Sequence, residues 1–127
     1  MDSIFTKIIK GEIPCYKVDE NDRFIAFLDI NPKAEGHTLV IPKKQIDRIW
    51  DLDDELYHAL WDYAKEIAAK IENAIACDRV GMWVEGLEVP HAHVHLVPLP
   101  SNGFYGLKKP EKTDDAYMQS VAQKISK

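Results

Sequence analysis

The segment 91-HAHVHLVPL-99 begins with three histidines that alternate with apolar residues. In a β-strand alternate side chains share a face, so the three imidazoles would project the same way, about 6.6 Å apart per pair. Ala92, Val94 and Leu96 would then pack into a core on the opposite face. The segment therefore predicts a strand with one polar, chemically active face and one buried apolar face.

The alternating histidines His91, His93 and His95 indicate a functional site. Imidazole titrates near neutrality and is only moderately apolar, so three on one face add little stability. A lone strand histidine would more often be structural. Two chemistries suit three of them: coordination of a transition metal, with Glu85 or Glu88 as a further ligand, or nucleophilic attack on phosphorus while neighbouring imidazoles bind the phosphate oxygens. The residue pattern alone leaves both open.

The elements around this segment predict an α+β fold of one domain, residues 1–127. Two strands, a loop, a third strand, a long helix and two more strands do not fit repeated βαβ units, which favours a mainly antiparallel five-stranded sheet. Short helices are expected near both ends, at residues 4–9 and 113–126, with a loop at 101–111. The expected strands are residues 15–21, 23–29, 37–44, 79–86 and 91–99.

The long helix has candidate N-caps at Asp51 and Asp53. Its main apolar stripe consists of Leu56, Leu60, Ala64, Ile67, Ile71 and Ile75. A second stripe widens this surface and consists of Tyr57, Trp61, Ala64 and Ala68. Either the helix lies deep against a curved sheet, or the second stripe contacts a partner subunit. The second reading favours a homodimer.

The composition excludes some classes of function. With a formal net charge of −5 and scattered lysines and arginines, the chain lacks the basic surface that nucleic-acid polymers require. No apolar stretch is long enough for a membrane span, and the N-terminal residues are too polar for a signal peptide, so we expect a cytoplasmic protein. Cys15 and Cys77 are then expected to be free, buried thiols.

The sequence HAHVHLV, with small or apolar residues between and after the histidines, resembles the signature of the histidine triad (HIT) family of nucleotide hydrolases and transferases. SIFTKIIKGEIP is similar to the opening helix of that family, and RFIAFLDINPKAEGHTLVIPKK to its ribose- and base-binding hairpin. The resemblance covers about residues 3–99, leaves the loop and helix of residues 100–127 outside it, and points to the branch of nucleoside phosphoramidases.

The resemblance implies hydrolysis or transfer at the α-phosphorus of a nucleoside phosphoramidate or a dinucleoside polyphosphate, through a covalent nucleotidyl-histidine. His93 would be the nucleophile, and His95 would bind the phosphate and help to protonate the leaving group. His91 would position the phosphate and the nucleophile, His37 would support the triad from a neighbouring strand, and Asp29 would hold the ribose hydroxyls. Apolar residues would form the slot for the base, namely Phe5, Ile8, Phe27, Leu28, Ile30 and Leu39.

Two positions depart from the family pattern. Ser3 and Thr6 stand where many bacterial members have zinc-binding cysteines, so no structural metal is expected, and Mg²⁺ would only accompany a polyphosphate substrate. Glu88 lies three residues before His91, where many members have a neutral Gly-Gln-Ser stretch, and a carboxylate there would repel phosphate. A nucleotide-binding regulatory module with little turnover, and a histidine-cluster metalloenzyme, remain alternatives.

Overall fold

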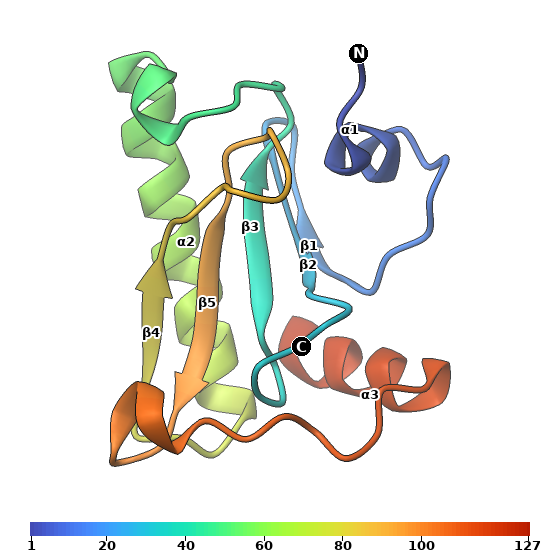
Figure 1. Cartoon of the computed structure of the whole chain (residues 1–127), viewed down its shortest axis with the longest axis vertical. Coiled ribbons are helices and arrows are strands. Elements are labelled where there is room, and N and C mark those ends of the chain that lie inside the picture. Colours follow the sequence, from blue (N-terminus) through green and yellow to red (C-terminus); the bar gives the residue numbers. More distant parts are fainter.

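The computed structural model describes residues 1–127 and has one five-stranded sheet (Figure 1). Its strands are β1 (Lys17–Glu20), β2 (Phe24–Leu28), β3 (Thr38–Pro42), β4 (Arg79–Trp83) and β5 (Val94–Leu99). They lie in the order β1-β2-β3-β5-β4, and every neighbouring pair is antiparallel. The predicted α+β class with an antiparallel five-stranded sheet is confirmed.

Three α-helices surround the sheet (Figure 1): α1 (Ile4–Ile9), α2 (Asp54–Ala74) and α3 (Asp115–Ser126). The long helix α2 runs behind β4 and β5 in the view of Figure 1, and α3 packs against β1 and α2. Two short 3-10 turns, Ile49–Asp51 and Gly103–Gly106, complete the structure. None of the helices combines the length and the apolar composition that a membrane crossing needs.

Strand alternation separates the buried side chains into two clusters. In β2, Ala26 and Leu28 face the main core between the sheet and the helices α2 and α3, whereas Ile25 and Phe27 face the other side. There they form a smaller cluster whose members are Phe5, Ile25, Phe27, Leu39 and Ile41. Phe5 comes from α1, so this helix covers the sheet face opposite α2 and leaves the rest of that face for the site.

The helix α2 begins where local signals place it. The Asp53 side chain accepts a hydrogen bond from the backbone N–H of Leu56, so Asp53 is the N-cap, while Asp51 belongs to the preceding 3-10 turn. On the second stripe Ala64 is fully buried, whereas Trp61 is half-buried and its Nε1 has no hydrogen-bond partner. The stripe therefore serves the core in part and also leaves an unsatisfied polar atom on α2.

Two expectations about the chain are corrected. The strand containing the histidines begins at Val94, because the Ala92 N–H bonds to the carbonyl of Ile46 and not to a neighbouring strand. His91 and His93 thus precede β5, and the three imidazoles do not form an evenly spaced row. Cys15 and Cys77 are free as expected, but they are only half-buried.

Candidate active site

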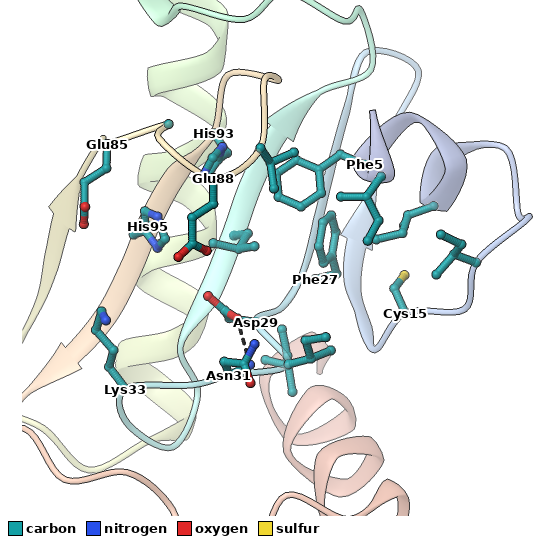
Figure 2. Close-up of a pocket in the computed structure, with 18 of the residues that line it drawn as sticks. Phe5, Cys15, Phe27, Asp29, Asn31, Lys33, Glu85, Glu88, His93 and His95 are labelled. Carbon is teal, nitrogen blue, oxygen red and sulfur yellow. Dashed lines mark hydrogen bonds between the residues drawn. The ribbon is translucent and has the colours of Figure 1, made fainter. Parts of the chain in front are cut away.

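A cavity of about 580 Å³ lies on the sheet face covered by α1 (Figure 2). Apolar residues line one part of it, including Phe5 and Phe27. His93 and His95 line another part, together with the carboxylates Asp29, Glu85 and Glu88 and the cation of Lys33. The cavity therefore joins an apolar slot to a polar end that contains two imidazoles.

His93 is held by a single hydrogen bond to the backbone. Its Nδ1 lies 2.7 Å from the carbonyl oxygen of His91, which can only accept, so Nδ1 carries the hydrogen. The edge of the ring packs against Phe5, with the ring centroids 5.0 Å apart, and the residue is only 6% exposed. Nε2 makes no hydrogen bond within the chain. A neutral ring therefore presents an unprotonated Nε2, which is a nucleophile, to the cavity.

The hydrogen bond from His37 determines which nitrogen of His95 accepts and which can donate. The backbone N–H of Lys33 donates to His37 Nδ1 (3.0 Å), so His37 must carry its hydrogen on Nε2 and donate it to His95 Nδ1 (2.9 Å). Burial lowers the pKa of His37 to about 3, and electrostatic repulsion from His95 and Lys33 acts in the same direction. The ring of His37 therefore stays neutral. Burial also lowers the pKa of His95. A neutral His95 therefore carries its hydrogen on Nε2 and is a donor.

The ring of His91 is directed away from the cavity. Its Nε2–H donates to the carbonyl oxygen of Pro42 at 2.7 Å, its Nδ1 accepts from the hydroxyl of Ser3 at 2.8 Å, and it does not line the cavity. The structure thus brings His93 and His95 together, with ring centroids 5.0 Å apart, and connects His91 to His93 through the His91 backbone carbonyl.

Asp29 lies at the cavity and also shapes the turn after β2. Its Oδ1 accepts the backbone N–H of Asn31 at 2.9 Å (Figure 2), and its Oδ2 lies 3.6 Å from His37 Nε2. Of the residues expected in the base slot, Leu28 borders the cavity but packs in the main core, and Ile30 is largely exposed at the rim. The others line the cavity on the side of α1, namely Phe5, Ile8, Phe27 and Leu39.

Several contacts at the site were not predicted from the sequence. Trp83 stacks on His95, with ring centroids 5.8 Å apart and an interplanar angle of 17°. The backbone N–H of Lys33 determines which nitrogen of His37 is protonated, and the carbonyl of Pro42 does the same for His91, whose other nitrogen contacts the hydroxyl of Ser3. No sequence motif marks these contacts, because they depend on where separate segments meet. Ser3 alone had a local signal, as a serine preceding a helix.

Neither the residues near Ser3 nor the group around His95 fits a metal ion. Ser3 and Thr6 offer hydroxyls instead of thiolates, and both nitrogens of His91 are engaged in hydrogen bonds, so a structural zinc has no suitable ligand set there. Ligand atoms of Asp29, His37 and His95 do lie within 4.8 Å of one another. His37 Nε2 and His95 Nδ1 are hydrogen-bonded to each other, so these two nitrogens already have partners without a cation.

The buried histidines should make stability depend on pH. The pKa of His37 is about 3 in the folded protein against 6.5 for the free side chain, so the unfolded chain binds its proton first as the pH falls. Above about pH 6.5 the difference between the two pKa values has no effect on stability. Between about pH 6.5 and about pH 3 the free energy of unfolding should fall by about 1.4 kcal/mol for each unit that the pH is lowered. His91 and His95 act in the same direction. Urea unfolding at pH 7.5 and pH 5 would measure this, and a His37→Asn variant should show a shallower slope.

Comparison with known proteins places the chain in a family. The model of the HIT domain matches residues 10–102. An uncharacterized HIT-like protein of Borreliella burgdorferi is 37% identical over 118 residues, which cover 87% of this chain and 85% of that protein. The adenosine 5'-monophosphoramidase of Schizosaccharomyces pombe is 39% identical over 109 residues, covering 84% of this chain and 80% of that enzyme.

The fold comparison agrees with the sequence comparison. A crystal structure of a HIT-like protein from Bartonella henselae superposes with a TM-score of 0.86 at 32% identity, covering 98% of this chain and 95% of that one. The family model and the superposed structure indicate the same family, and the cavity lined by His93 and His95 is consistent with it. The chain belongs to the HIT domain family.

Proposed function

We propose that the protein hydrolyses nucleoside phosphoramidates through a covalent nucleotidyl-histidine on His93. One observation carries the proposal: His93 donates from Nδ1 to a carbonyl, which leaves Nε2 unprotonated at the cavity wall. The S. pombe relative, whose name is that of an adenosine monophosphoramidase, supports the choice of substrate class. The apolar slot beside Phe5 and Phe27 would hold the base, and Asp29 would bind the ribose hydroxyls.

In the first step His93 Nε2 forms a bond to the α-phosphorus, and the phosphorus–nitrogen bond breaks. When the phosphoramidate nitrogen is protonated, it leaves as a neutral amine, and the nucleotidyl-imidazolium remains on the protein. In the second step water attacks phosphorus, the nucleoside monophosphate is released, His93 returns to neutral and one proton goes to the amine or to solvent. His95 Nε2–H would donate a hydrogen bond to the phosphate oxygens, where negative charge builds up in both steps.

The carboxylates at the cavity favour phosphoramidates over dinucleoside polyphosphates. Figure 2 shows the Glu88 carboxylate directed into the cavity on the side of His95 and Asp29. Neither Glu85 nor Glu88 forms an ion pair within the chain, and Lys33 is the one cation at the cavity wall. A polyphosphate leaving group would meet these negative charges and would need Mg²⁺ to offset them, whereas an amine leaving group would not.

Mass spectrometry of the quenched reaction tests the proposal. Protein mixed with adenosine 5'-phosphoramidate should gain the mass of one adenylyl group on the peptide that contains His93. A nucleotide-binding module without turnover would bind the compound and show no adduct.

A substrate panel tests the choice of substrate class. Diadenosine tetraphosphate should be hydrolysed more slowly than adenosine 5'-phosphoramidate, and Glu88→Gln should reduce the difference between the two rates. Equal rates for the two substrates in the unaltered protein would contradict the assignment of substrate class.

We also propose that the chain forms a homodimer through β4 and the adjoining face of α2. The strand β4 is an edge of the sheet, and its Met82 is 41% exposed. Tyr57 and Trp61 lie half-buried on α2, which contacts β4, so their exposed parts adjoin the edge strand. Sedimentation equilibrium would distinguish a dimer from a monomer.

A further inference from the structure

A hydrogen-bonded network joins the start of α1 to the histidine segment. The Ser3 hydroxyl donates to His91 Nδ1 at 2.8 Å and accepts from the backbone N–H of Thr6 at 3.0 Å. Gln45 Oε1 accepts from the Ser3 backbone N–H at 2.7 Å and from the Thr6 hydroxyl at 2.6 Å. Ser3 is 6% exposed and His91 is fully buried. The network therefore connects three separate segments of the chain: its Ser3–His91 bond is buried, whereas Gln45 lies at the surface.

The partners of His91 determine its protonation. A carbonyl oxygen can only accept, so His91 Nε2, which lies 2.7 Å from the carbonyl of Pro42, carries the hydrogen. Burial lowers the pKa of His91, which favours the neutral ring, and Nδ1 of the neutral ring must then accept. Its donor is the hydroxyl of Ser3, whose one hydrogen is closer to His91 Nδ1 (2.8 Å) than to Thr6 Oγ1 (3.3 Å).

We propose that Ser3 is a positioning residue for the nucleophile and acts through His91. The ring of His91 is fixed at both nitrogens, by Ser3 on one side and Pro42 on the other. The carbonyl of the same residue accepts the Nδ1–H of His93 at 2.7 Å. Losing the Ser3 donor would leave a buried acceptor unsatisfied and free the ring to rotate, which would shift the carbonyl that aims His93.

Ser3 has a second role, as the N-cap of α1, and the two roles need different atoms. The cap uses a lone pair of the hydroxyl oxygen, whereas the contact with His91 uses the hydrogen. Three substitutions separate them. Ser3→Thr keeps both the lone pair and the hydrogen, Ser3→Asp keeps an N-cap acceptor without a hydrogen to donate, and Ser3→Ala removes both.

The kinetic arm of the test depends on the proposed function, with adenosine 5'-phosphoramidate as substrate. Because small displacements of a reacting group are costly, Ser3→Asp and Ser3→Ala should each lower kcat by about tenfold or more with little change in KM. Ser3→Thr should retain most of the turnover. If Ser3→Asp turns over as fast as the unaltered protein and only Ser3→Ala is slow, the residue acts as a helix cap and the proposal is wrong.

The second arm requires no substrate, so it separates this proposal from the proposed function. In protein labelled with ¹⁵N-histidine, the ¹⁵N shifts of His91 report which nitrogen is protonated. The unaltered protein and Ser3→Thr should show His91 protonated at Nε2 alone. In Ser3→Asp the carboxylate facing Nδ1 should raise the pKa of His91, so that both nitrogens become protonated at a higher pH than in the unaltered protein. Protonation of His91 Nδ1 in the unaltered protein would overturn the proposal. So would identical titrations of His91 in the unaltered protein and in Ser3→Asp. Both results could be read even if the protein hydrolyses no phosphoramidate.

Discussion

Replacing His93 by alanine should lower kcat for adenosine 5'-phosphoramidate by about 10⁴-fold or more, because no other side chain offers an unprotonated nitrogen at the same position. The residues proposed to bind the nucleoside are untouched by the change, so nucleotide affinity should stay measurable. Steady-state kinetics and isothermal titration with adenosine monophosphate would determine the two quantities separately. The mass-spectrometric adduct should also disappear.

A second variant controls for damage to the fold. In His93→Gly the space of the missing ring is open to the cavity, so added imidazole should restore part of the turnover without restoring the protein-bound adduct. His58→Ala, at an exposed position on α2, should leave kcat unchanged. Near-normal hydrolysis by His93→Ala would show that another group attacks phosphorus.

Replacing His95 by alanine should lower kcat by about 10²–10³, the usual loss when one donor to a developing oxyanion is removed. The His37–His95 hydrogen bond makes His95 a neutral donor through Nε2–H and disfavours an imidazolium that could release a proton. The loss should therefore be similar for two adenosine substrates whose leaving groups differ in basicity, a phosphoramidate and a p-nitrophenyl phosphate ester.

The comparison of the two leaving groups separates this role from general acid catalysis. A general acid matters when the leaving group is an amine and hardly at all when it is p-nitrophenolate. A loss confined to the phosphoramidate would therefore show that His95 delivers a proton to the leaving group. His95→Gln, which retains a neutral N–H donor, should recover part of the activity if hydrogen bonding to the phosphate is the main contribution.

Features with a local cause could be predicted from the sequence. Short apolar runs next to turn or loop residues predicted β2 and β3, and Asp53 followed by a periodic apolar stripe predicted α2. The order of these elements excluded repeated βαβ units and indicated the antiparallel sheet. The resemblance to the HIT family singled out His93, His95, His37 and Asp29, and the structure brings these four residues together around one end of the cavity.

The tertiary structure decided which atom of each histidine can react. The alternating pattern predicted a continuous strand, but the backbone of His91 and Ala92 is bonded to Val89 and Ile46, so that segment leaves the sheet. The protonated nitrogen of each ring follows from partners that the pattern does not encode. The carbonyl of Pro42, for example, which fixes the hydrogen of His91 on Nε2, lies 49 residues from His91 in the sequence.

The histidine segment 91–99 predicted a site for phosphorus or metal chemistry and a strand with a buried face. Only the fold decided that His93 offers an acceptor nitrogen and His95 a donor. The physical reason is that strand and helix formation depend on neighbouring residues, whereas the position of a hydrogen on a buried imidazole depends on which donors and acceptors distant segments place beside it.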